Sequence, residues 1–346
     1  MSGEILQREI YEQPDVVARF LACEHDHIEN IAQRLRGGFH YMVIAARGTS
    51  DNAARYAKYI FGAHNQIPIS LATPSLFTLY RQPPVMDGAL VIGISQSGRS
   101  PDILSVIREA HDQGQPTLAI TNDPDSPLAM SADDVILLNA GPEKAVAATK
   151  TYTTSLMALG LLSSHMTEDK VRLRQLQELP ALLERTLDSN SVILEQASRF
   201  RTKDHYVVIG RGYNYATAFE ISLKIKELTQ TLAEPYSSAD FLHGPIALIH
   251  PGFPIIIISQ HGSVFENLGE LAERLKSLEG ELLIISNDEE LLAEAHLAMP
   301  IPPEAPEWIS PLLTVLPGQL FSLGLARARG LDPDNPRGLT KITETW

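Results

Sequence analysis

Two stretches of the sequence concentrate residues that could do chemistry, and the first is a hydroxyl-rich turn. Ser95-Gln-Ser-Gly-Arg-Ser100 places three hydroxyls and a glycine between an apolar run and a helix-compatible segment. Free backbone amides and the positive end of a helix dipole attract anions at such a turn. We therefore expect a phosphate monoester to bind here, with Thr49 and Ser50 adding two hydroxyls. The plain alternative is an ordinary helix N-cap.

The second stretch combines carboxylates, lysines and a histidine. It runs from Lys224-Ile-Lys-Glu227 through Glu234 to His243-Gly-Pro245. Carboxylates and imidazoles are the common general acid–base groups, and a lysine can form a Schiff base with a carbonyl. On composition alone, a solvated helix face followed by a turn histidine is the simpler interpretation. Lys341, near the end of the sequence, likewise reads as an exposed tail residue.

Two further motifs suggest cofactors but fail on spacing. In Gly210-Arg-Gly-Tyr-Asn-Tyr215, a tyrosine stands where a dinucleotide site needs its third glycine, and no Walker A sequence is present. Cys23-Glu-His-Asp-His27 offers metal-ligand side chains, but on a helix only Cys23 and His27 share a face. A solvated helix surface is the preferred interpretation of that segment. The sequence thus predicts no cofactor and no metal.

The elements that must position these residues come in two copies. Three short apolar runs recur in the same order, two at an offset of 164 residues and one at 165. The pairs are Val43–Gly48 with Val207–Gly212, Ile94–Gly98 with Ile258–Gly262, and Leu118–Asp123 with Leu283–Asp288. This indicates a duplicated domain. His261 replaces Ser97 in the second copy, so we expect phosphate binding only in the first.

Each copy has the pattern of an α/β domain. Apolar runs rich in Val, Ile and Leu alternate with helix-compatible stretches, which predicts a doubly wound parallel sheet flanked by helices. In the first copy we expect strands at 42–46, 89–94, 116–121 and 134–138, and helices at about 50–62, 101–113 and 149–165. A helix is expected over 312–329, after an irregular Pro-rich loop at 300–311. The expected parts are an N-terminal tail and one helix at 1–37, a first domain at 38–166, a helical connector interrupted by Pro180 at 167–200, a second domain at 201–330, and a C-terminal tail at 331–346.

Composition excludes several classes of protein. A single cysteine excludes an internal disulfide, and 44% hydrophobic residues in 346 exclude a disordered chain. The net charge of −14 argues against partners such as nucleic acid or an anionic membrane. The most apolar run, around Ile255–Ile258, is too short to cross a bilayer, and no secretory signal is evident. We expect a cytoplasmic protein with a neutral, hydroxyl-lined phosphate pocket.

At these residues the sequence resembles the SIS (sugar isomerase) domain family in its tandem form. It is similar in particular to the isomerase half of glutamine:fructose-6-phosphate aminotransferases and to stand-alone glucosamine-6-phosphate deaminases. The resemblance covers nearly the whole chain. Its motifs are Gly48-Thr-Ser50, Ser95-Gln-Ser-Gly98, Ala148-Thr-Lys150, Lys224–Glu227, His243-Gly-Pro245 and Pro336-Arg-Gly-Leu-Thr-Lys341.

The resemblance implies a role for each group of residues. It implies that the sugar phosphate is held by Ser95, Gln96, Ser97 and Ser100, and that the sugar lies near Thr49, Ser50, Val146 and Ala148. Glu227 corresponds to the base that moves a proton between C1 and C2, and Lys224 helps set the charge around it. His243 corresponds to the group that assists ring opening, and it reaches the site from a neighbouring subunit, which implies a homodimer. Lys341 corresponds to the Schiff-base lysine, so the C-terminal tail completes the site.

Departures from the aminotransferase pattern bear on the reaction. Arg47 replaces a cysteine, Ala148 replaces a serine, and the segment before His243 differs. The sequence begins Met1-Ser2 and holds only Cys23, so no glutaminase domain is expected. The preferred reaction is deamination of a hexosamine 6-phosphate, above all glucosamine 6-phosphate, to a ketose 6-phosphate. The alternatives are a synthase using external ammonia or a separate glutaminase, a fructosamine-type 6-phosphate deglycase, a deaminase/isomerase for galactosamine or tagatose phosphates, and a noncatalytic sugar-phosphate sensor.

Overall fold

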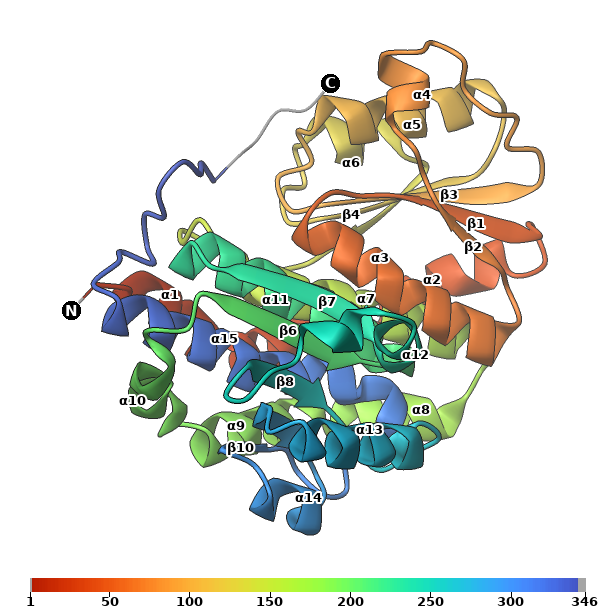
Figure 1. Cartoon of the computed structure of the whole chain (residues 1–346). Coiled ribbons are helices and arrows are strands. Elements are labelled where there is room, and N and C mark those ends of the chain that lie inside the picture. The colour runs from red at the N-terminus through yellow and green to blue at the C-terminus, as the bar shows by residue number, and fades with distance from the viewer. Residues whose placement is uncertain (1, 342–346) are drawn as a thin grey trace. The chain divides into compact units, whose positions relative to one another are not determined.

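The computed structural model describes residues 2–341, which form two compact units (Figure 1). The first-repeat unit comprises residues 15–143, 150–179 and 340–341. The second-repeat unit comprises residues 2–14, 144–149 and 180–339. Segments that are far apart in sequence therefore belong to one unit, and each unit is described by itself.

The first-repeat unit is built on a parallel sheet with strand order β2-β1-β3-β4-β5. Every residue of β3 is buried, as expected of a central strand covered by helices on both faces. Apolar side chains of α5 pack against those of β1 and β3 on one face, and α3 lies on the other (Figure 1). The strands are β1 Tyr41–Ala45, β2 Ile69–Leu71, β3 Ala89–Ser95, β4 Thr117–Thr121 and β5 Asp134–Leu137. The helices are α2 Gln13–Leu35, α3 Thr49–Ile60 with a π-helical turn Phe61–Asn65, α4 Ser75–Thr78, α5 Pro101–Asp112, α6 Pro127–Ser131, α7 Lys150–Met166 and α8 Lys170–Gln177.

The second-repeat unit has the same topology. Its strand order, β7-β6-β8-β9-β10, matches that of the first sheet strand for strand, and all pairs are parallel. This confirms the predicted α/β fold with two repeats. The strands are β6 His205–Gly210, β7 Leu232–Ser237, β8 Pro254–Ile258, β9 Glu281–Ser286 and β10 Leu297–Pro300. The helices are α1 Glu4–Tyr11, α9 Leu179–Ser189, α10 Ile193–Gln196, α11 Tyr215–Thr229, α12 Ser238–Leu242, α13 Phe265–Ser277, α14 Glu289–Ala293 and α15 Ser310–Ala328, with four short 3-10 turns among them.

Several elements differ from those predicted. The N-terminal stretch that was expected to be a tail forms α1. Strands β2 and β7 were not predicted, because β2 has only three residues and β7 contains Glu234 and Pro235, which strands disfavour. The helical connector is interrupted as predicted: α8 ends at Gln177 and α9 begins at Leu179, with Pro180 as its second residue, where a missing N–H costs nothing. The Pro-rich loop contains a short helical turn at Glu307–Ile309.

Helix α15 corrects the expectation about the most apolar segment. Within the described residues, Glu307–Ala328 is long and apolar enough to cross a membrane, and its apolar stretch lies entirely inside the protein. Its mid-helix Pro317 and Gly318 are buried, with Gly318 closely packed on Ile221 of α11. Such burial is the behaviour of a core helix that is apolar on all sides.

Candidate active site

The Ser95–Ser100 turn joins β3 to α5 at the carboxyl edge of the first sheet. Ser95 is buried, and its Oγ accepts a hydrogen bond from the Gly98 amide at 3.1 Å. Gly98 has φ +60°, and a Cβ at this position would lie 2.2 Å from Ser126 Oγ. The turn therefore closes on itself and requires glycine at its bend.

This turn leaves donors available to an anion. Within residues 2–341, the amides of Ser97 and Ser100 donate to no other protein group. Ser100 is the N-cap residue of α5, yet its side chain makes no capping hydrogen bond. The ordinary N-cap interpretation therefore leaves the hydroxyl of Ser100 unexplained. Amides and hydroxyls at a helix N-terminus are the groups that bind phosphate in many proteins.

The second predicted turn lies at the same sheet edge. β1 and β3 are adjacent and parallel, so the residues that follow them meet at one edge of the sheet. Thr49 and Ser50 begin α3 there and are partly exposed. The Arg47 Nε donates to Asp102 Oδ2 at 2.7 Å, and the Asp102 carboxylate is fully buried in the first turn of α5. This edge therefore carries a guanidinium and a carboxylate whose charges offset each other.

In the second-repeat unit, α11 carries a buried charge cluster. The Lys224 Nζ lies 2.6 Å from Glu227 Oε2 and 3.4 Å from Glu220 Oε1. Lys224 and Glu220 are almost completely buried, whereas the Glu227 side chain is 23% exposed. Burial alone would lower the pKa of Lys224, but the two carboxylates outweigh it and hold that pKa above its ordinary value.

The charge cluster separates the roles of its members. A lysine that stays protonated cannot be a Schiff-base nucleophile, but its ammonium can hold the Glu227 carboxylate in place through their ion pair. Glu227 is a positioned carboxylate with the exposure that a base needs. Glu220 was not predicted. It lies four residues before Lys224, and this spacing places the two side chains on one helix face, where they can form an ion pair.

The other predicted residues of the second-repeat unit stand apart from the charge cluster. His243 follows α12 and is exposed; its amide donates to the Asp240 carbonyl oxygen, and its imidazole makes no hydrogen bond or ion pair with any described residue. Val146 and Ala148 are partly exposed on the loop 144–149, where the amides of Lys144 and Ala145 donate to the Glu9 carboxylate. No hydrogen bond joins these residues to Lys224 or Glu227.

Lys341 lies in the first-repeat unit and is paired. Its Nζ is 2.9 Å from Glu143 Oε2, and the Glu143 side chain is completely buried. Glu143 also accepts hydrogen bonds from the Thr151 amide at 3.1 Å and from the Thr151 hydroxyl at 2.9 Å. The sequence did not predict Glu143. The only feature of the sequence that marks Glu143 is that its carboxylate comes shortly before the helix predicted at about 149–165.

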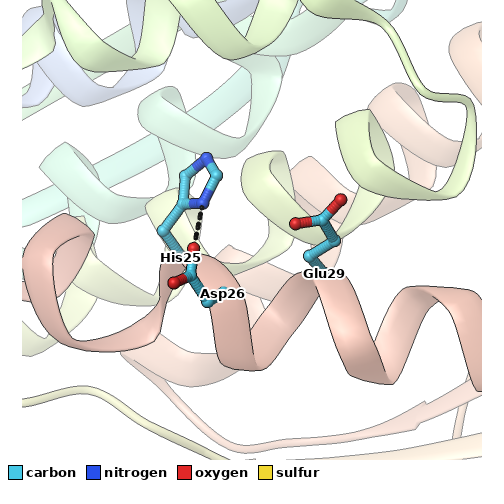
Figure 2. Close-up of side chains that lie close together, drawn as sticks. All are labelled: His25, Asp26 and Glu29. Atoms are coloured by element: carbon cyan, nitrogen blue, oxygen red, sulfur yellow. Dashed lines mark hydrogen bonds and ion pairs between the residues drawn. The ribbon is translucent and has the colours of Figure 1, made fainter.

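The metal-ligand side chains on α2 group differently from the prediction. Figure 2 shows His25, Asp26 and Glu29, whose ligand atoms lie within 4.8 Å of one another. His25 Nδ1 is 3.1 Å from Asp26 Oδ1, and the Asp26 side chain is 96% exposed. His27, predicted to share a face with Cys23, has its Nε2 2.8 Å from the Val135 carbonyl oxygen. Exposed acidic groups often gather in this way without an ion, so we assign no metal here.

Comparison with known proteins identifies the repeats. The SIS domain model matches residues 40–164 and 199–328. The glutamine–fructose-6-phosphate aminotransferase [isomerizing] of Aquifex aeolicus is 36% identical over 341 residues, which cover 96% of this chain and 56% of that protein. The chain thus spans little more than half the length of this relative.

Solved structures extend the likeness. The C-terminal domain of glucosamine-fructose-6-phosphate aminotransferase from Francisella tularensis is 27% identical, with a TM-score of 0.86 and coverage of 96% of this chain and 98% of that one. Glucosamine-6-phosphate deaminase from Thermotoga maritima, 22% identical, shares the fold with a TM-score of 0.81 over 99% of this chain and 100% of that one. The chain belongs to the SIS domain family and contains two SIS domains in tandem.

Proposed function

We propose that this protein is a cytoplasmic, homodimeric sugar-phosphate isomerase that deaminates a hexosamine 6-phosphate, in the first place glucosamine 6-phosphate. The products are a ketose 6-phosphate and ammonia. The observation that carries the proposal is the charge cluster of α11, in which a buried ammonium supports a partly exposed carboxylate at Glu227. The isomerizing relatives support the class of reaction, and their full activity is extended to this chain only as part of the proposal.

The substrate phosphate binds at the turn of the first repeat. Its oxygens accept hydrogen bonds from the free amides and hydroxyls of the turn, and the partly exposed Arg47 guanidinium lies at the same edge. Anchoring the phosphate at C6 fixes the position of C1 and C2, which proton transfer requires. The residues assigned to the phosphate are Ser95, Gln96, Ser97 and Ser100, and those assigned to the sugar are Thr49, Ser50, Val146 and Ala148.

Proton transfer by Glu227 converts the aldose into a ketose imine. After ring opening, assisted by His243 from the neighbouring subunit, the substrate has an aldehyde at C1 and an amine at C2. Glu227 removes the C2 proton and returns it at C1, which leaves an imine at C2. The Lys341 amine displaces ammonia from C2 as a Schiff base, and water then releases the ketose and the free lysine.

A second candidate is a deglycase for the amino-acid adduct of a sugar 6-phosphate, and Arg47 favours it. Asp102 binds the Nε of Arg47, and the terminal amino groups make no hydrogen bond with any residue in 2–341. The Arg47 side chain is 49% exposed. A guanidinium presented in this way can bind the carboxylate of an amino-acid substituent through two parallel hydrogen bonds.

A substrate panel separates these functions. Glucosamine 6-phosphate, galactosamine 6-phosphate, a fructosyl-amino-acid 6-phosphate and unphosphorylated glucosamine are each assayed for ammonia, ketose or aldose, and free amino acid. We expect ammonia and ketose 6-phosphate in equal amounts from the first, and no turnover of the last. Turnover confined to the adduct identifies the deglycase. Thermal stabilisation without turnover identifies a sensor and rejects the proposal, as does ammonia release that the Glu227→Gln variant matches.

A further inference from the structure

We propose that Glu143 is the positioning residue for Lys341, holding its amine in place and exchanging a proton with it. This inference rests on the proposed function, because the chemical role of Lys341 belongs to that proposal. It concerns a residue that lies 198 positions from Lys341 in the sequence and contacts it directly.

The Glu143 carboxylate is fixed independently of the C-terminal segment. Both Thr151 hydrogen bonds come from the first turn of α7, a helix whose residues 150–165 are all buried. The positive end of the helix dipole also favours a carboxylate at this place. Glu143 is therefore a rigid anchor that belongs to the folded first-repeat unit.

Lys341, in contrast, depends on that anchor. The residues from Leu331 onward that the structure describes form no helix or strand, and the Lys341 side chain is 23% exposed. Among the described residues, Lys341 forms an ion pair with Glu143 alone. A completely buried carboxylate loses several kcal/mol of hydration, so its attraction for a cation is far stronger than at the surface. The pair therefore sets where the amine of Lys341 lies.

The same contact provides a route for the proton. A lysine must lose a proton before its nitrogen can attack carbon, and the Nζ to Oε2 distance of 2.9 Å is that of a direct hydrogen bond. The ammonium gives one proton to the carboxylate, and the neutral amine adds to the imine carbon at C2. The Glu143 carboxylic acid then returns that proton to the departing nitrogen, which leaves as ammonia, so that protons and charge balance.

Trapping the Schiff base tests this role directly. The full chain is incubated with fructose 6-phosphate and sodium borohydride, and the reduced adduct on the Lys341 peptide is quantified by mass spectrometry. We expect Glu143→Gln to lower the rate of adduct formation and kcat at least tenfold, with KM for the sugar phosphate within about twofold, since the phosphate turn is untouched. Glu143→Asp should recover part of the loss, and the dependence of adduct formation on pH should change in Glu143→Gln.

Glu9→Gln is a matched control. Glu9 is also a buried glutamate that accepts amide hydrogen bonds from the neighbouring loop residues Lys144 and Ala145. It should change thermal stability without changing the adduct at Lys341 or its pH dependence. If Glu143→Gln forms the adduct as fast as the wild type, or if Glu9→Gln slows adduct formation as much as Glu143→Gln does, the positioning role is overturned while the proposed function stands. If the wild type forms no adduct and turns over no hexosamine phosphate, the proposed function itself is rejected, and the positioning role with it.

Discussion

The turns that follow β3 and β8 occupy the same place in two copies of one fold, but in the second a carboxylate of the chain lies against the turn. After β3, the amides of Ser97 and Ser100 have no protein acceptor among the described residues. After β8, the Ser263 amide donates to Glu307 Oε2 at 3.0 Å. A Cβ at Gly262 would lie 2.3 Å from Glu307 Cδ, so the carboxylate rests directly against the turn.

The difference shows how two copies of one fold can differ in the turn that follows the central strand. The topology provides a hydrogen-bonding turn after the central strand in both repeats. In the second repeat, a carboxylate of the chain itself supplies the negative charge, and His261, whose Nε2 is 3.3 Å from Asp288, replaces a serine. The second turn is therefore held by a carboxylate of the chain, whereas the first keeps amides that no described residue accepts from.

The strongest way to break this contrast is to disrupt the first turn at Gly98. In Gly98→Ala, the new Cβ meets Ser126 and the positive φ strains the backbone, at a cost of about 1–3 kcal/mol in the free energy of unfolding. Because the amides move with the turn, we expect kcat/KM for the sugar phosphate to fall roughly 100-fold. Steady-state kinetics and thermal unfolding check both effects. Gly114→Ala is the control, since it has φ +71° with open space around its Cβ; equal kinetic losses in the two variants would contradict the account.

A smaller change to the first turn is to give it the residue that stands at the equivalent position of the second turn. Ser97→His removes a hydroxyl from the first turn and introduces the residue of the second copy. Hydrogen bonds to charged groups contribute about 1.5–3 kcal/mol, so KM for the sugar phosphate should rise roughly 10- to 100-fold with little change in thermal stability. An unchanged KM would remove Ser97 from the phosphate site.

Acid should act on the first-repeat unit through His64. Burial, followed by the charge of Arg172, lowers the pKa of His64 from 6.5 to about 4. The unfolded chain therefore binds a proton more readily, so this contribution to stability is present above pH 6.5 and is lost as the pH falls toward 4. We expect His64→Gln to reduce the loss of stability between pH 7 and pH 5 by about 1 kcal/mol, measured by urea unfolding at each pH. An identical pH dependence in the variant and the wild type would contradict this assignment.

The smallest effect is expected at the internal carboxylate of the second turn. Glu307→Gln keeps an acceptor for the Ser263 amide but removes the charge, which should cost about 0.5–1 kcal/mol of stability. Catalytic constants should stay within about twofold of the wild type, because the proposed phosphate site is the turn of the first repeat. A large fall in kcat/KM without unfolding would show that the second turn also serves the reaction.

The sequence predicted the parts of this molecule that follow local patterns. Buried apolar runs followed by turn residues predicted the central strands and the repeat, because parallel strands covered on both faces need such runs. Short or half-exposed strands such as β2 and β7 carry too little of that pattern. Partners supplied by tertiary contact were also missed: Asp102 for Arg47, Glu143 for Lys341 and Glu307 for Ser263 lie 55, 198 and 44 residues away.

The central claim is that Glu227 moves a proton between C1 and C2 of a sugar bound through its phosphate. Turnover of glucosamine 6-phosphate in deuterium oxide, followed by NMR of the ketose product together with ammonia release, tests it most directly. We predict deuterium at C1 of the ketose, because the proton held by Glu227 exchanges with solvent before one is returned, and a rate at least about 100-fold lower in Glu227→Gln, with KM nearly unchanged. Equal rates in the variant and the wild type, or equal turnover of unphosphorylated glucosamine, would contradict the claim.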